Sequence, residues 1–243
     1  MPTGDDAERR VSVEQCDANA EVELPVASEY DARYFARVYN GSSNGHDAAQ
    51  TVLDRLRDAR ISDVTRRYAP DSPDRPAVLD VGCGYGWILD RLGDSFDLYA
   101  MDVSAHALAR TGGRVRDAVV ARANVEEGIP FSRRFDAVLA VNVLEHLGDP
   151  AAAVTAIHDA LVPGGVAVVH LPTIDNAVSR LFYWMTYARD HTHVYRPSAK
   201  AVRALFASAG FALVNDSHCP HVPRALWNMV PWHPAYLAVF RRT

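Results

Sequence analysis

Short apolar runs alternate along the chain with stretches whose apolar residues recur at helical spacing. A short continuous apolar run is typical of a buried strand, and strands that alternate with helices predict a parallel sheet covered on both faces. The expected strands are residues 77–81, 97–102, 118–123, 135–141 and 165–171, followed by a final pair at 211–214 and 235–240. Helices are expected near residues 86–93, 104–110, 150–161 and 197–209.

The region before the first strand has a different pattern. Residues 1–27 are polar and acidic with little periodicity, which predicts an extension outside the fold. A helix is expected from Ser28 to the breaker at Asn40-Gly41, and a second over about 47–59. The second helix places three apolar side chains on one side: Val52, Leu53 and Leu56.

A glycine-rich turn follows the first expected strand, where residues 78–86 read Val-Leu-Asp-Val-Gly-Cys-Gly-Tyr-Gly. Glycine at every second position lets the chain turn sharply, bring backbone N–H groups against a ligand and open a helix. A dinucleotide fingerprint needs a further glycine where Trp87 stands, which disfavours a nicotinamide-dependent reductase. With no pyrophosphate to hold, Asp80 just before the turn can bind a cationic amino group through water.

A second carboxylate, Asp102, closes the next expected strand about 20 residues further on. A carboxylate at that place can accept hydrogen bonds from both hydroxyls of a ribose. Ser104 then provides an N-cap for the following helix. Together, the glycine turn and Asp102 resemble the first motifs of class I S-adenosylmethionine-dependent methyltransferases that act on small molecules.

The resemblance continues through residues 124–131 and 142–150. In the family, the residue at position 124 is usually an aspartate that accepts from the adenine amino group; Asn124 can accept through its amide oxygen instead. The backbone near Asn142 lies beside the methionyl group in the family, and the histidine at position 146 is there a positioning or structural residue more often than a base. The resemblance implies these cofactor-binding residues: Asp80, Gly82, Cys83, Gly84, Tyr85, Gly86, Asp102, Val103, Asn124, Val125, Glu126, Asn142, Val143 and His146.

The resemblance also implies a fold and a division of the chain. The fold is a Rossmann-like, doubly wound α/β sheet of seven mostly parallel strands with an antiparallel last strand. Residues 1–27 form the polar extension, 28–74 an N-terminal helical lid whose tyrosines cap the pocket, and 75–243 the cofactor-binding core. Within the core, residues 172–197 form an insertion that contributes to the acceptor pocket.

Acceptor chemistry is expected in Asp190-His-Thr-His-Val194, which resembles a family pattern found after the fifth strand. Histidine titrates near neutrality and can remove a proton from the acceptor, so His193 is the first candidate base and His191 the second. Alternatively, both are ordinary loop histidines bonded to Asp190. Nearby aromatic residues can line the acceptor pocket or form the core of the lid: Phe182, Tyr183, Trp184, Tyr187, Trp227 and Trp232.

A metal site is not expected from the sequence. Five histidines crowd the last third of the chain without a matching carboxylate pattern: His191, His193, His218, His221 and His233. Three widely spaced cysteines assemble neither a disulfide framework nor a four-thiolate zinc site. Few cysteines, no signal peptide and no long apolar span predict a cytoplasmic protein without a membrane segment.

The predicted activity is methyl transfer to a small molecule, with an oxygen acceptor favoured. A formal net charge of −5 speaks against nucleic acid as a partner. A nucleic-acid or protein methyltransferase remains an alternative, although Asn142-Val143 stands where adenine or glutamine nitrogen methylation needs Asn-Pro-Pro-Tyr. A non-catalytic protein that binds S-adenosylmethionine and assists a partner is the third possibility.

Overall fold

The computed structural model describes residues 30–38, 50–72, 74–187, 190–218 and 233–243. The predicted extension at 1–27 lies outside these residues, as do His221, Trp227 and Trp232. The strands are β1 (Ala77–Val81), β2 (Asp97–Asp102), β3 (Val119–Arg122), β4 (Phe135–Val141), β5 (Leu161–Pro172), β6 (Phe211–His218) and β7 (Ala235–Arg242). The helices are α1 (Ala32–Val38), α2 (Val52–Tyr68), α3 (Trp87–Leu92), α4 (Ala105–Arg114), α5 (Pro150–Ala160), α6 (Ala177–Thr186) and α7 (Ala199–Ser208), with short 3-10 turns η2 (Val125–Glu127) and η3 (Leu144–His146).

The described strands form one seven-stranded sheet in the order β3-β2-β1-β4-β5-β7-β6. Strands β1 to β5 are mutually parallel, whereas β7 pairs antiparallel with both β5 and β6. The predicted Rossmann-like α/β fold with an antiparallel last strand is therefore confirmed. Strand order reverses between β1 and β4, and ligands of open α/β sheets bind at such a switch point, outside the carboxyl ends of the strands.

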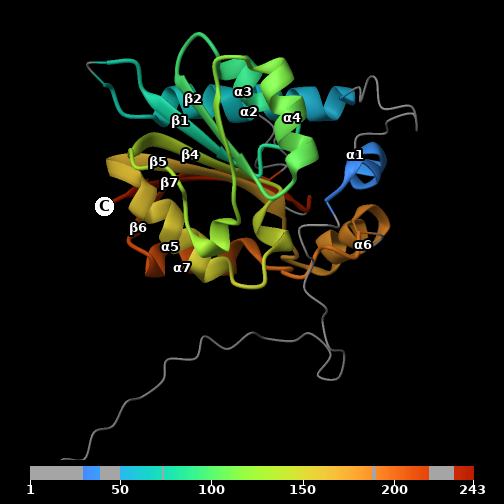
Figure 1. The fold of residues 1–243 in the computed structure, drawn as a ribbon. Coiled ribbons are helices and arrows are strands. Elements are labelled where there is room, and N and C mark those ends of the chain that lie inside the picture. Colours follow the sequence, from blue (N-terminus) through green and yellow to red (C-terminus); the bar gives the residue numbers. More distant parts are fainter. Residues whose placement is uncertain (1–29, 39–49, 73, 188–189, 219–232) are drawn as a thin grey trace, which may run out of the picture.

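Helices cover both faces of the sheet, as Figure 1 shows: α2, α3 and α4 lie on one side, and α5 and α7 on the other. The fully buried β1, which is apolar except for Asp80, supplies both layers, because successive side chains of a strand point to opposite faces. Val78 packs in the cluster with Ile61 and Leu89, and Leu79 packs in the opposite cluster with Phe206. This double burial explains why β1 reads as an apolar run up to Asp80.

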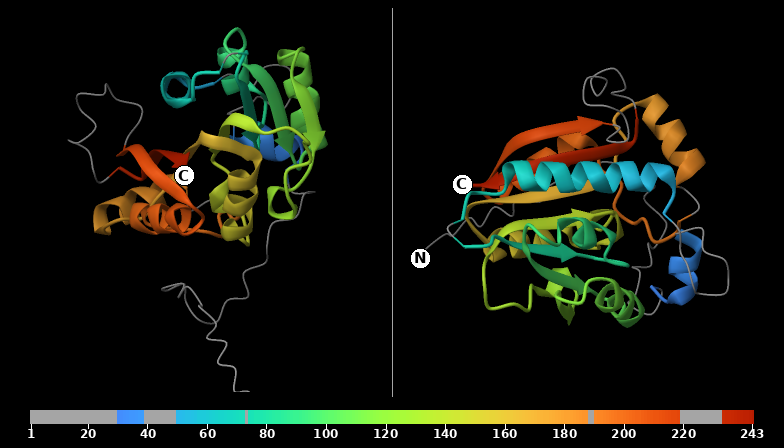
Figure 2. Two further views of the ribbon diagram at one scale, coloured as in Figure 1. Left: turned by 90° about the vertical axis from the view of Figure 1, so that its left-hand side faces the viewer. Right: turned by 90° about the horizontal axis from the view of Figure 1, so that it is seen from above.

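Helix α2 differs from its prediction. It begins at Val52, because Thr51 and Asp54 form a capping box at its start, and it continues to Tyr68. The three apolar side chains predicted to share a side, Val52, Leu53 and Leu56, are exposed. The buried face lies further along the helix, and α2 packs against α3 and the sheet (Figure 2).

Within the described part of the predicted lid over 28–74, α1 and the beginning of α2 lie at the carboxyl ends of the strands. Tyr30, two residues before α1, is tied to the core through its carbonyl oxygen, which accepts from Ser104 Oγ at 2.6 Å. Helix α6 lies within the predicted insertion at 172–197, although no helix was predicted there. Among the described residues, no helix is both long and apolar enough to cross a membrane.

Candidate functional site

The carboxyl ends of β1, β2 and β4 open into a cavity of about 760 Å³, bounded on its other sides by α1, α2 and the end of α6. Thirteen predicted site residues line it: Asp80, Gly82, Cys83, Gly84, Asp102, Val103, Asn124, Val125, Glu126, Asn142, Val143, His146 and His193. Three other predicted residues, Tyr85, Gly86 and His191, do not belong to its lining. The structure thus brings together residues from five separate stretches of the sequence.

The turn after β1 requires glycine at Gly82. Its φ is +64°, and a Cβ there would lie 2.5 Å from Cγ2 of Val143. Gly86, also with positive φ, is the N-cap of α3 and packs against Thr111. Tyr85 points elsewhere: its ring stacks on Phe35 with centroids 5.1 Å apart. Gly86 and Tyr85 therefore shape and support the turn, and Gly82 permits close approach to the cavity.

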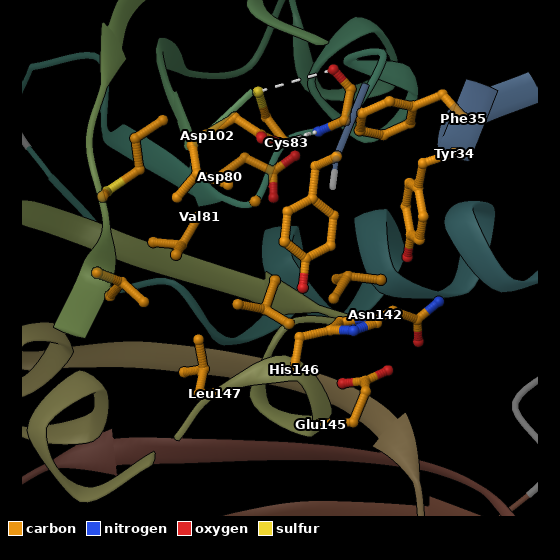
Figure 3. Close-up of a pocket in the computed structure, with 18 of the residues that line it drawn as sticks. Tyr34, Phe35, Asp80, Val81, Cys83, Asp102, Asn142, Glu145, His146 and Leu147 are labelled. Carbon is orange, nitrogen blue, oxygen red and sulfur yellow. Dashed lines mark hydrogen bonds between the residues drawn. The ribbon is translucent and has the colours of Figure 1, made fainter. Parts of the chain in front are cut away.

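Asp102 joins the turn to the end of β2. Its Oδ2 accepts from the backbone N of Gly84 at 3.0 Å (Figure 3), and its Oδ1 accepts from the backbone N of Ser104 at 2.8 Å. Burial raises the pKa of this carboxyl, and the backbone hydrogen bonds oppose that shift. Each carboxylate oxygen keeps a further lone pair, so Asp102 can accept from two more hydroxyl groups.

Asp80 is buried beneath the turn. Burial raises the pKa of Asp80 well above its usual range, and the negative charges of Asp58 and Asp102 raise it further. A carboxyl in this environment favours a nearby cation, because only a positive charge offsets the lost hydration and the neighbouring acids. Asp80 thus suits the ammonium group predicted for it.

Asn124 caps the short helix η2 at another part of the cavity wall. Its Oδ1 accepts from the backbone N of Glu126 at 3.1 Å, and Nδ2 is 3.4 Å from Oε2 of Glu126. These two contacts define the orientation of the Asn124 amide, because the oxygen accepts from a backbone N–H and the nitrogen faces a carboxylate. Asn124 can therefore accept from an exocyclic amino group through its second lone pair.

Two histidines meet at the end of the cavity away from Asp102. The rings of His146 and His193 are 4.8 Å apart between centroids and nearly perpendicular. Nδ1 of His146 lies 3.1 Å from the carbonyl oxygen of Thr192, and Nδ1 of His193 lies 3.0 Å from the hydroxyl of Tyr183. Both rings are therefore held in place through Nδ1. Nε2 is the ring nitrogen that these two contacts do not use.

The electrostatics of this end keep both imidazoles neutral. Burial lowers the pKa of His146, and burial together with the neighbouring His146 lowers the pKa of His193 to about 4 despite the opposing charge of Asp190. Burial alone would raise the pKa of Asp190, but hydrogen bonds from Thr192 and the two histidines bring it below its usual value. Asp190 is therefore ionised at neutral pH.

Glu145 is a site residue that the sequence pattern did not reveal. It is only 1% exposed, and its Oε2 has no hydrogen-bond partner. Burial raises the pKa of Glu145 to about 8. Figure 3 shows its carboxyl group at the same end of the cavity as His146 and far from Asp102. No local motif marks such a residue, because its position beside His193 depends on how distant loops pack.

Aromatic side chains from the α1 region close over this end. The ring of Tyr30 meets His146 edge to face at 5.8 Å, and that of Tyr34 lies 6.5 Å from His146. Arg57 of α2 also lines the cavity, although the sequence pattern did not indicate it. Its guanidinium group forms ion pairs with Asp54 at 3.0 Å and with Asp58 at 2.9 Å.

Comparison with known proteins identifies the family. A family model described as a methyltransferase domain matches residues 53–216, which is most of the chain. This chain belongs to that methyltransferase family. Its motifs and its sheet order are those of class I S-adenosylmethionine-dependent methyltransferases.

Individual relatives of this methyltransferase differ in their acceptors. It is 34% identical over 114 residues to the ubiquinone biosynthesis O-methyltransferase of Psychrobacter cryohalolentis (43% of this chain, 44% of that protein). It is 31% identical over 146 residues to the tRNA U34 carboxymethyltransferase of Aliivibrio salmonicida (56% of this chain, 44% of that protein). The chain therefore spans less than half the length of these curated relatives.

A solved structure shows the same fold. The N-methyltransferase NodS from Bradyrhizobium japonicum WM9, in complex with S-adenosylhomocysteine, superposes with a TM-score of 0.60 at 17% identity and covers 86% of this chain and 97% of that one. The cavity of this methyltransferase fits such a cofactor on its own features. The glycine turn approaches Val143 where a Cβ would collide, and Asp102 offers acceptors for a diol.

Proposed function

We propose that this methyltransferase transfers the methyl group of S-adenosylmethionine to a hydroxyl group of a small organic molecule. The proposal depends mainly on one observation: a single cavity of about 760 Å³ is lined by the cofactor residues and by His193. Ligand pockets typically measure about 300–1,000 Å³, so there is room for the cofactor and a modest acceptor together. Tyr30 and Tyr34 narrow the acceptor end.

The residues that line the cavity divide into one group at the cofactor and a second group at the acceptor. Asp102 would accept from the ribose hydroxyls, Asn124 from the adenine amino group, and Asp80 would balance the methionyl ammonium. The backbone after β4 contributes a strained turn, because Asn142 has φ +54° and its Oδ1 lies 2.8 Å from Nδ1 of His170. This conformation directs the chain around the methionyl end.

The second group acts at the acceptor. When bound, the cofactor supplies a methyl group on a cationic sulfur, which leaves as a neutral thioether. The attacking hydroxyl must lose its proton, and His193 is the side chain at which we expect that proton to leave. Its imidazole is neutral and therefore keeps a nitrogen lone pair that can accept a proton. His191 is exposed and outside the cavity lining, so the proposal does not extend to it.

A nucleic-acid acceptor is the main competitor, because one relative is named for its action on tRNA. The formal net charge of −5 favours a small molecule over a polyanion. A protein acceptor and a purely cofactor-binding role also compete with the proposal, and both predict no methylated small product.

Transfer of a radiolabelled methyl group from S-adenosylmethionine tests the proposal. We expect label in hydroxylated small molecules from a panel of phenols, catechols and sugars, and none in bulk tRNA or protein. His193→Ala should abolish transfer while S-adenosylhomocysteine still binds. His158→Gln is a matched control on α5, away from the cavity, and should transfer normally. Label found only in tRNA or only in protein would contradict the proposal.

A further inference from the structure

The acceptor end of the cavity gathers more ligating groups than proton transfer requires. Glu145, His146 and His193 each place one ligand atom within 4.8 Å of the other two. We propose that these three side chains bind a divalent transition-metal cation such as Zn²⁺ or Mn²⁺ beside the acceptor. This inference rests on the proposed function, because it concerns the same cavity and adds a cation to its acceptor end.

The orientation of His146 supports ligation. Its Nδ1 lies 3.1 Å from a backbone carbonyl, that of Thr192, and a carbonyl oxygen can only accept. Nδ1 therefore carries the hydrogen, and Nε2 offers a lone pair. Histidines that bind metals nearly always donate their other ring N–H to a carbonyl or carboxylate, which fixes the ring and its tautomer.

His193 has a comparable support. Its Nδ1 is 3.0 Å from the hydroxyl of the buried Tyr183. Its Nε2 lies 3.8 Å from Oδ2 of Asp190, beyond hydrogen-bonding distance. A tyrosine hydroxyl can accept from Nδ1–H of His193, and in that tautomer Nε2 of His193, like that of His146, offers a lone pair to a cation.

Glu145 supplies the independent observation. Its side chain is fully buried, yet Oε2 has no hydrogen-bond partner. Leaving a carboxyl oxygen buried and unpaired is costly, and buried acids are normally paired with a cation or coordinate a metal. The described residues around Glu145 include two histidines, and the charge of Arg57, which is paired with Asp54 and Asp58, lowers the pKa of Glu145, but none of these residues gives Oε2 a hydrogen bond.

Two imidazoles and one carboxylate favour first-row transition metals over Mg²⁺ or Ca²⁺, which prefer oxygen ligands. Ligand atoms around a tetrahedral zinc ion are about 3.4 Å apart, given metal–ligand distances of about 2.1 Å, so the three side chains would approach by roughly an ångström on binding. Three protein ligands also leave a coordination position open, as in catalytic sites.

The open position would face the acceptor, since all three side chains line the cavity. A hydroxyl bound to a divalent cation loses its proton far more readily than a free one. With its Nε2 on the cation and its Nδ1 on Tyr183, His193 would hold the cation, and the acceptor's proton would leave to another group. The carboxylate of Asp190, which also lines the cavity, is placed to receive the proton.

Calorimetric titration of the tag-free full chain with ZnCl₂ and with MnCl₂, after removal of metals by a chelator, tests the proposal. We expect one cation per chain for at least one of the two. Glu145→Gln and His146→Gln should each weaken that affinity at least tenfold. His158→Gln and Asp159→Asn change a similar histidine–acid pair on α5, away from the cavity, and should leave the affinity unchanged.

Two further readouts keep the test decisive. Co²⁺ should give visible absorption bands with the native chain that Glu145→Gln loses, and each variant should still bind S-adenosylhomocysteine. Absence of a one-to-one site for both cations, or equal affinity in the native chain and Glu145→Gln, would overturn the metal site and leave the methyltransferase proposal standing. Failure of the native chain to bind S-adenosylhomocysteine would instead remove the proposed function.

Discussion

Replacing Asp102 by alanine gives the sharpest prediction for the cofactor site. The carboxylate accepts from Gly84 N at 3.0 Å and Ser104 N at 2.8 Å, and would also accept from two ribose hydroxyls. Hydrogen bonds to a charged group each contribute about 1.5–3 kcal/mol, so losing both ribose bonds costs about 3–6 kcal/mol. That range corresponds to at least a roughly hundredfold weaker affinity for S-adenosylhomocysteine.

Calorimetric titration with S-adenosylhomocysteine measures this loss, and circular dichroism shows whether the variant is folded. The matched control is Asp97→Ala, which removes a carboxylate from the opposite end of the same strand. Asp97 is half exposed and contacts Arg75 and Arg133 at 3.7 and 3.8 Å, so its removal should leave affinity unchanged. A folded Asp102→Ala variant that binds within threefold of the native chain would refute the reasoning.

Three other variants test separate features. Gly82→Ala should lower stability by at least about 1 kcal/mol and abolish cofactor binding, measured by thermal melting and titration, because φ is positive and the new Cβ meets Val143. Since the folded pKa of Asp80 is raised, the folded state holds more protons than the unfolded state above about pH 4, and stability falls as pH rises. Asp80→Asn should therefore melt higher than the cofactor-free native chain, by a larger margin at pH 8 than at pH 5; equal margins would contradict this. Phe206→Ala removes a ring stacked 4.2 Å from Phe240, and should cost about 3–5 kcal/mol in denaturant unfolding without changing the cavity.

The strands near the centre of the sheet were predictable because burial on both faces leaves a clear local signal. β1, β2 and β4 have the predicted bounds, and each ends at a residue that lines the cavity or directly precedes one that does. Helix α2 was less predictable. Its start is marked by the capping box at Thr51 rather than by its apolar residues, of which Val52 is 72% exposed.

The acceptor end could be predicted only in part. His146 and His193 each lie in a recognisable motif, but nothing local indicates that they touch. Glu145 was missed because an acid next to a histidine has no distinctive pattern until the loop after α6 packs against it. The network from Tyr183 through His193 to Asp190 likewise joins residues whose contacts exist only in the folded chain.

A crystal structure of the chain with S-adenosylhomocysteine tests the central claim most directly. We predict the ribose hydroxyls within hydrogen-bonding distance of Asp102, the adenine amino group against Asn124, and the sulfur facing the end of the cavity that holds His146 and His193. A ligand bound outside this cavity, or bound with its ribose away from Asp102, would contradict the account.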